Sequence, residues 1–452
     1  MKNKIIILFL MLASSFAFSQ TEGSSSEDNS ITGPKIIIKE IHYITDKYTR
    51  ESALDRKLNI SVGKEFENLP DLEEYLEEKA QLLRNLRVFE EVKYRYVTIE
   101  DLEGKETGIM VIYEVVGAWT IFPIALPKYD SNTGWRVTGK LYYDNFFGTL
   151  TKFYLGGNID IETVNGDVEV SQWTLNPKLS SLTFGRFTFD LNIYQQYQQI
   201  TKYDSESNVY EEDYSLHSTS LNTATSINLP WDLYYSFGPS FQWFYNYKDN
   251  LPDNGSNIEE EDLQFSWGHS VGYNSIDWIG NFRKGTAASI GNSIAWAQDL
   301  ESDGKFKTGL SYSAMAFYIW KRLNPSVHIS GIYSFNEEQS GLGGTLRGIR
   351  NEDMYGIASA NLNTSVNISV IPWEGVGEAL CQPFFDLGIA FKEDGTYDRE
   401  RDFKYSAGAD FILYLDILKS LVARGSIGID LTNPDWGDTR KYEISIESSL
   451  HY

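Results

Sequence analysis

The sequence has few cysteines, histidines and basic residues, and each shortage excludes a class of site. Among 452 residues there are one cysteine, Cys381, and five histidines. One cysteine cannot form an intramolecular disulfide, and the scattered histidines give no spacing typical of zinc ligands. Lys and Arg number 39 against 63 Asp and Glu, a formal net charge of -24. Nucleic acid is therefore an unfavourable partner, because binding to phosphate backbones requires clustered cations.

Long apolar runs are also missing, apart from one near the N-terminus. Lys2 and Lys4 precede an apolar stretch that ends in small residues. The stretch is shorter than the ~18 residues that a membrane-spanning helix needs. Residues 1–19 are therefore expected to be a cleavable secretory signal. Residues 20–33 are rich in serine and acidic side chains, so we expect a disordered linker there.

Aromatic residues, in contrast, are abundant: 29 Tyr, 25 Phe and 11 Trp. An exported, aromatic-rich chain without further apolar helices is typical of an outer-membrane β-barrel. A secreted β-sandwich or solenoid is the alternative, and the strand pattern has to separate the two.

Residues 34–117 predict a compact α+β domain with the order β-α-α-β-β. Strands are expected at Ile36–Ile41, Val92–Val97 and Ile109–Val116, and a short helix from Thr49. A second helix is expected over Asp71–Leu86, because apolar residues recur there at three- and four-residue spacing. This apolar stripe consists of Leu72, Leu76, Ala80, Leu83 and Leu86.

Residues 118–452 change to a period of two, which predicts an all-β antiparallel barrel of about 16 strands. In the last strand Tyr442, Ile444, Ile446, Leu450 and Tyr452 share one face, and Lys441, Glu443 and Ser445 share the other. The same alternation places Ser406 and Asp410 opposite Phe411. Apolar faces toward lipid and polar faces toward a closed interior are what a membrane barrel requires.

Two motifs in the barrel region carry a family resemblance. The segment Gly341–Arg350 contains Leu346, Arg347 and Gly348, and the strand Pro383–Phe391 contains Phe385, Asp386 and Gly388. Together with the preceding domain, which resembles a single POTRA domain, they resemble the outer-membrane assembly-factor superfamily of BamA/TamA type. The resemblance covers nearly the whole chain after the signal. With one such domain, the protein resembles a short member.

The resemblance implies that a loop folds into the barrel and that Arg347 meets Asp386 there. A charge-assisted Arg347–Asp386 pair would hold the loop, and Gly343, Gly344 and Gly348 would allow tight backbone turns. The alternative is that Arg347 lies on an ordinary exposed hairpin. Two departures from the family pattern predict a less tightly held loop: Ile349 replaces an aromatic residue, and the strand after the loop lacks a second acidic partner.

The resemblance implies that the seam between the first and last barrel strands has a function. Pro123 and Pro127 lie on one side of this seam, and the last strand, with its apolar face, lies on the other. Each proline removes a possible ladder hydrogen bond, although prolines are also tolerated at a strand's entry. A seam that opens could template client strands. We therefore expect an outer-membrane protein with a periplasmic N-terminal domain that assists insertion or translocation of client proteins, with lipid and accessory subunits as further partners. A passive channel or receptor, or TamA-like export of lipid or surface polymer, are the alternatives.

Enzymatic and metal sites find little support in the sequence, and no cofactor is expected. Ser61–Lys64 fits a Ser-x-x-Lys spacing but lacks companion motifs and falls in a predicted turn. The acidic run Asn257–Asp262 resembles a solvated loop, with loose cation binding as the less favoured interpretation. Cys381 is expected to be a wall or rim residue.

Overall fold

The computed structural model describes residues 35–450, except positions 47, 103–105, 131–133, 165–166, 205–208, 251–260, 300–304, 336–337, 340, 351–352, 393–394, 398–401, 417–420, 434 and 438–440. The predicted signal, the predicted linker and Tyr452 lie outside the described residues. Among the residues described, no helix is both long and apolar enough to cross a bilayer.

The N-terminal domain is a four-stranded sheet covered by two helices. Its sheet order is β2-β1-β4-β3, with β1 parallel to β4 and β3 antiparallel to it. The predicted strands and helices are present, and the structure adds the two-residue strand β2, which is too short to produce a period. The elements are β1 (Lys35–Ile44), α2 (Glu51–Leu58), β2 (Glu65–Phe66), α3 (Leu69–Asn85), β3 (Phe89–Leu102) and β4 (Glu106–Gly117).

Helix α3 forms where its sequence pattern places it. Asn68 caps it by accepting a hydrogen bond from the Asp71 amide at 2.9 Å, and a proline occupies the first turn, where its missing N–H costs nothing. Its buried residues are Leu72, Leu76, Ala80 and Leu83, which are the predicted stripe apart from the partly buried Leu86. This face packs on the sheet and forms the domain's apolar core.

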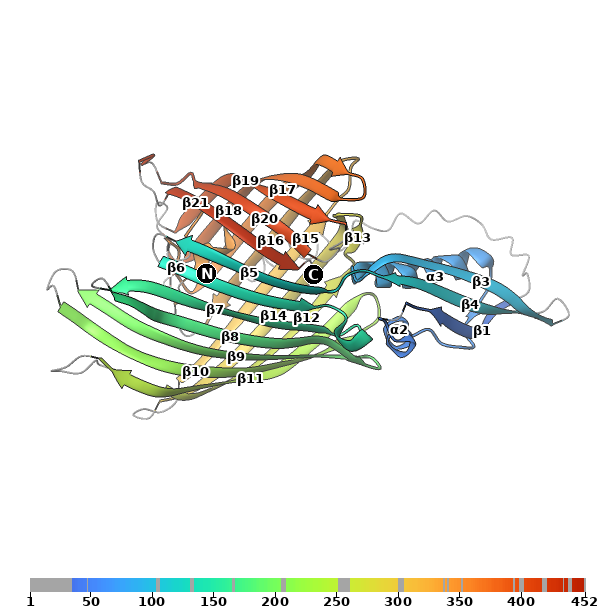
Figure 1. Cartoon of the computed structure of the whole chain (residues 1–452), viewed down its shortest axis with the longest axis horizontal. Coiled ribbons are helices and arrows are strands. Elements are labelled where there is room, and N and C mark those ends of the chain that lie inside the picture. Colours follow the sequence, from blue (N-terminus) through green and yellow to red (C-terminus); the bar gives the residue numbers. More distant parts are fainter. Residues whose placement is uncertain are drawn as a thin grey trace.

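The remaining strands form one antiparallel sheet that closes into a barrel (Figure 1). Among the described residues, sixteen long strands make up the wall, and the three-residue β13 lies in the connection between β12 and β14, which pair directly. The strands are β5 (Ile121–Asp130), β6 (Gly134–Tyr143), β7 (Lys152–Val164), β8 (Asp167–Phe184), β9 (Phe187–Asp204), β10 (Val209–Asn228), β11 (Leu233–Asp249), β12 (Glu261–Asn274), β13 (Asp277–Ile279), β14 (Phe282–Asp299), β15 (Lys305–Phe317), β16 (Leu323–Ser334), β17 (Ala358–Trp373), β18 (Gly377–Phe391), β19 (Phe403–Leu415), β20 (Leu421–Asp430) and β21 (Tyr442–Leu450), with the short helices η1 (Phe146–Gly148) and η2 (Leu342–Thr345) in connections.

The barrel has its apolar side chains outside and polar ones inside. On β19, Phe411 is 58% exposed on the outer surface, whereas Ser406 and Asp410 are completely buried on the inner one. On β21, Ile444 is exposed, as its alternation predicts. A soluble sandwich would bury this apolar face, so the exposed outer surface favours contact with lipid.

Large aromatic side chains gather at the end of the barrel that adjoins the N-terminal domain, which we call the near rim. Only residues 118–120 separate β4 from β5, so β5 starts at this end and every second connection returns to it. Exposed aromatic residues occur in or beside five of these connections, and they are Phe147, Phe184, Trp231, Tyr318, Trp320 and Trp373. Such a belt is typical of the boundary between a bilayer and water.

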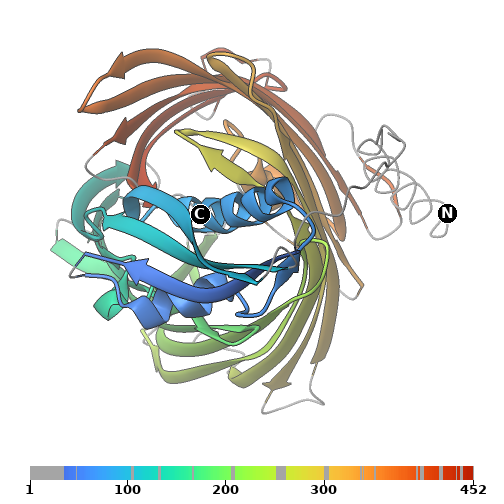
Figure 2. The same ribbon diagram turned by 90° about the vertical axis from the view of Figure 1, so that its right-hand side faces the viewer.

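The N-terminal domain docks on the near rim through the end of α3. Arg87, only 7% exposed, donates to the Gly280 carbonyl at 2.8 Å and to Asn281 Oδ1 at 2.9 Å. Asn85 donates to Asp277 Oδ1 at 2.9 Å and accepts from the Trp278 amide at 3.0 Å. Figure 2, which views the barrel from this end, shows α3 crossing in front of the opening. The β13 connection therefore holds the domain over the mouth of the barrel.

Candidate functional site: an inward-folded loop and the strand seam

The segment between β16 and β17 folds against the inner face of the barrel. Its residues 341–350 contact strands β17 to β21, and η2 forms its first turn. We call residues 341–350 the lumen loop. The segment therefore lies inside the barrel, where the resemblance places it, and not on an exposed hairpin.

Arg347 lies at the centre of this contact. Its Nε and one terminal nitrogen donate to the two oxygens of Asp386 at 2.9 and 2.7 Å, and its backbone N–H donates to Asp386 at 3.0 Å. The other terminal nitrogen donates to Asp410 at 3.2 Å. Both carboxylates are fully buried, and the guanidinium lies over the Phe384 ring at 4.0 Å. A planar, bidentate ion pair of this kind fixes orientation as well as position.

The two acidic partners correct one expectation from the sequence. The strand after the loop indeed supplies no acid, and we expected the loop to be held loosely for that reason. Instead Asp410, two strands further along the wall, supplies the second carboxylate. Arg424 lies 3.8 Å from the same carboxylate, so two cations and two acids alternate along the inner face.

Backbone contacts tie the loop to the last strands as well. Gly348 donates its N–H to Glu443 of β21 at 2.6 Å, and Ser406 of β19 donates its hydroxyl to the Arg347 carbonyl. Gly348 has φ +82°, and a Cβ there would lie 2.8 Å from the Ile429 nitrogen. Opposite it, a Cβ on Gly428 would meet the Gly348 Cα at 2.5 Å. Loop and wall therefore approach each other as closely as two glycines permit.

Apolar side chains of the loop are also buried. Leu342, Leu346, Ile349, Met354 and Ala390 form a buried cluster. Ile349, the departure from the family pattern, is thus a core residue of the loop.

The glycines of the motifs have different roles. A Cβ on Gly388 would lie 2.5 Å from Leu346, so this glycine makes room for the leucine on the wall. Gly343 and Gly344 lie in η2 without positive φ, and among the predicted loop glycines Gly348 alone needs the left-handed region. Phe385 points outward and is 42% exposed, as its alternation with Asp386 predicts.

The seam between β5 and β21 shows what the two prolines do. Asp144 donates its N–H to the Thr120 carbonyl at 2.9 Å, and the pairing of β5 with β6 continues from there without a register shift. Hydrogen-bonded positions recur at every second residue of an antiparallel pair. Even-numbered residues of β5 therefore bond to β6, and Pro123 and Pro127 direct their missing N–H groups toward β21. Both losses fall on the seam.

The other predicted site residues lie in the barrel wall. Tyr442 and Ile444 are exposed on the outer face of β21; Ile446 and Leu450 occupy the same strand, paired with Gly425 and Leu421 of β20. Cys381 is a partly exposed wall residue of β18 with a free thiol.

The segments considered for enzymatic chemistry and cation binding lie outside the lumen loop and the seam. Ser61–Lys64 forms a turn before β2. Of the acidic run, positions 257–260 lie outside the described residues, and Glu261 begins β12 instead of belonging to a loop. Within the described part of the chain, no group of three or more His, Cys, Asp and Glu residues could hold a metal ion.

Comparisons with known proteins agree with this architecture. No family model matches the chain, and no curated protein sequence matches it. Among solved structures, BamA from Haemophilus ducreyi lacking POTRA domains 1–3 is 13% identical, with 92% of this chain and 85% of that chain covered and a TM-score of 0.50. CdiB from Acinetobacter baumannii is 14% identical, with 91% and 73% covered and a TM-score of 0.56. CdiB from Escherichia coli is 13% identical, with 99% and 97% covered and a TM-score of 0.54. At these identities the similarity establishes the fold.

Proposed function

We propose that this protein is an outer-membrane barrel that assists the insertion or translocation of client proteins. In this proposal the near rim faces the periplasm, the N-terminal domain is a single periplasmic POTRA-like unit, and a client strand pairs with an edge exposed between β5 and β21. The fold shared with BamA and CdiB supports the class of protein. The order of the N-terminal sheet, with β1 parallel to β4, agrees with the POTRA-like assignment.

The observation that carries the proposal is the orientation of Pro123 and Pro127. Five other barrel strands in the described residues contain one proline each, whereas β5 contains two, and both face the same neighbour. Each ladder bond contributes on the order of 1 kcal/mol to stability. The β5–β21 junction therefore lacks two ladder donors, which lowers the cost of separating these two strands.

Strand length acts in the same direction. Within the described residues, β5, β6 and β20 have 10 residues and β21 has 9, whereas β8 and β9 have 18. About 9–11 residues let a tilted strand cross a bilayer. The strands at the seam therefore have little length beyond the span, and they have fewer ladder hydrogen bonds to lose on separation than the long strands have.

The lumen loop determines which side of the seam moves. Glu443 of β21 accepts from the loop, and the loop is pinned to β18 and β19 through Arg347. The C-terminal side of the seam is thereby held in place, so β5 is the strand that separates. Its freed edge then offers backbone groups for pairing with an incoming strand.

The experiment restores the missing donors. A Pro123→Val/Pro127→Val variant should strengthen the seam and raise the thermal midpoint of the barrel. In cells depleted of the native protein, this variant should restore client proteins to the outer membrane less well than the wild type does. Quantitative proteomics of that membrane provides the readout. Pro239→Val is the matched control, because Pro239 lies in β11 opposite Trp267, away from the seam.

The outcomes separate the proposal from its rivals. Normal client levels with the double variant would rule out opening at this seam. An outer-membrane proteome unchanged by depletion itself would rule out the assembly role and favour a passive channel. A wide passive channel is disfavoured at present, because the lumen loop occupies one side of the interior and α3 crosses the near mouth.

A further inference from the structure

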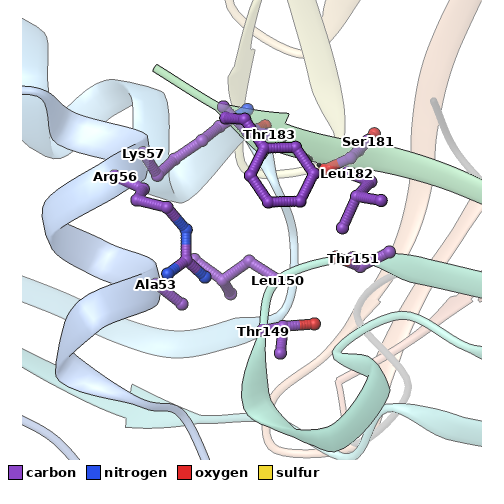
Figure 3. Close-up of a pocket in the computed structure, with 10 residues that line it drawn as sticks. Ala53, Arg56, Lys57, Thr149, Leu150, Thr151, Ser181, Leu182 and Thr183 are labelled. Carbon is purple, nitrogen blue, oxygen red and sulfur yellow. Dashed lines mark hydrogen bonds between the residues drawn. The ribbon is translucent and has the colours of Figure 1, made fainter. Parts of the chain in front are cut away.

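A small cavity lies between α2 of the N-terminal domain and the near rim of the barrel (Figure 3). It has a volume of about 240 Å³. Arg56 and Lys57 enter it from the last turn of α2, and the barrel contributes Thr149–Thr151 from one connection and Ser181–Phe184 from the end of β8. The barrel side of the cavity therefore presents both hydroxyl groups and the apolar side chains of Leu182 and Phe184 to the two cations.

Among the residues that the structure describes, these two cations have no anionic partner. Within the described part of the chain, neither Arg56 nor Lys57 forms an ion pair or a side-chain hydrogen bond. Burial lowers the pKa of Lys57 below its ordinary value, as expected for an ammonium group removed from water without compensation. A third cation, Lys152, lies close enough to interact with Lys57, but it also interacts with Asp144 and Asp190.

The cavity lies at the level of the aromatic belt. Phe184, one of its lining residues, is 58% exposed, and Phe147, two residues before Thr149, is 65% exposed. Beyond Phe184 the outer surface continues with Phe189, Leu191 and Ile193, all exposed. Exposed aromatic residues mark the height at which lipid headgroups meet acyl chains. In the proposed membrane location, the cationic cavity therefore lies at the height of the lipid phosphates.

We propose that this cavity binds the phosphate group of an anionic phospholipid in the leaflet that the near rim contacts. Arg56 and Lys57 hold the phosphate, and Leu182 and Phe184 contact the start of an acyl chain. The volume agrees with this occupant, since it is below the ~300 Å³ of sites that enclose whole small molecules. The inference rests on the proposed membrane location, and it is independent of how clients are handled.

Binding would have a structural consequence. Because α2 supplies the cations and β8 the opposite wall, one bound lipid would bridge the N-terminal domain and the barrel. The orientation of the domain would then depend on anionic lipid, in addition to the Arg87 contacts on the other side of the mouth.

The test uses the purified full chain in a nonionic detergent. Native mass spectrometry would count lipids bound during titration with short-chain phosphatidylglycerol, with short-chain phosphatidylcholine and with inorganic phosphate. The variant Arg56→Gln/Lys57→Gln removes both charges while keeping good helix formers. Lys93→Gln/Arg95→Gln removes the same charge from exposed pairs on β3 and is the matched control.

We expect the wild type and the control to bind one phosphatidylglycerol in preference to both other ligands. The double variant should lose roughly twentyfold in affinity for it, since each cation near an anionic surface contributes to attraction. Equal phosphatidylglycerol binding by the double variant and the wild type would overturn the proposal. Inorganic phosphate binding as tightly as the lipid would also overturn it and indicate a free-anion site.

Two further variants keep the result interpretable. If Arg56→Gln/Lys57→Gln fails to fold, as judged by the heat-modifiable mobility of the barrel, Lys57→Gln alone gives the decisive comparison, with an intermediate loss expected. The Pro123→Val/Pro127→Val variant should bind phosphatidylglycerol normally whether or not the seam opens, so failure of the lipid site and failure of the client-handling proposal are distinguishable.

Discussion

Strands β18 and β11 lie in different parts of the same barrel wall and have different interiors. Along β18, inward-facing residues are buried at almost every second position, whereas no residue of β11 is buried. Most of the difference comes from the lumen loop, which lies against β17–β21 and supplies Arg347 to the acids there. Leu380 is buried instead in a separate cluster with Ile412 and Tyr414. A polar barrel interior can therefore be packed like a protein core, but only where a segment brings compensating partners.

The same two regions differ in what their charges do. In the packed region, Arg347 joins two fully buried carboxylates from two strands. In the region away from the loop, Arg136 makes a bidentate contact with Asp160, and its side chain is 37% exposed. Breaking each pair should therefore have consequences of different size.

The largest effect is expected for Arg347→Ala. It leaves Asp386 buried without a cation and Asp410 with only Arg424, at 3.8 Å, and such a loss costs about 3–5 kcal/mol of unfolding free energy. Arg136→Ala, the matched change, should cost about 1–2 kcal/mol. It affects one carboxylate instead of two, and Asp160 keeps a hydrogen bond from the Asn158 side-chain amide at 2.9 Å. Urea unfolding of both variants in detergent micelles measures the difference, and equal losses would show that the lumen loop adds nothing to the stability of the packed region.

A smaller contrast is expected for two glycines. Gly348→Ala places a Cβ in a left-handed conformation against the backbone of β20, so we expect a loss of about 2–3 kcal/mol. Gly268→Ala in β12 meets no atom within 4 Å and should change stability by less than about 1 kcal/mol. The same urea experiment applies. A stable Gly348→Ala variant would mean that the loop can withdraw from the wall at little cost.

The sequence predicts part of this contrast, because alternation with a period of two shows which face of the barrel each side chain occupies. Alternation correctly assigned Asp386 and Asp410 to the inner face, and it placed Ile444 and Phe411 outside. Alternation gives the face of a residue but not its height along the barrel. Height depends on the stagger between strands, which is fixed by long-range pairing. Alternation therefore cannot identify Asp410 and Glu443 as partners of the loop.

The N-terminal domain follows the same logic. The stripe of α3 was recognisable because its spacing is local. Docking of Arg87 on the β13 connection joins residues more than 190 positions apart, and no local pattern signals it. The cavity beside α2 likewise exists only because the fold brings a helix end and a barrel rim together.

The smallest effect on stability is expected for Lys57, which has no acidic partner in the described residues, whereas Arg347 has two. Because burial lowers the pKa of Lys57, the folded protein binds this proton less well than the unfolded chain does. Lys57 therefore destabilises the folded state at neutral pH, and this penalty disappears as pH rises from the lowered pKa toward the ordinary value of 10.5. In lipid-free detergent, Lys57→Met should be slightly more stable than the wild type at neutral pH, and the difference should shrink near the ordinary pKa.

Lys93→Met, at an exposed position, should show neither effect. Urea unfolding at the two pH values measures this, and a wild type more stable than Lys57→Met at neutral pH would mean that the ammonium group already has a partner. Added anionic lipid should reverse the sign for Lys57, because the lipid would supply the counter-charge that Arg347 obtains from the wall.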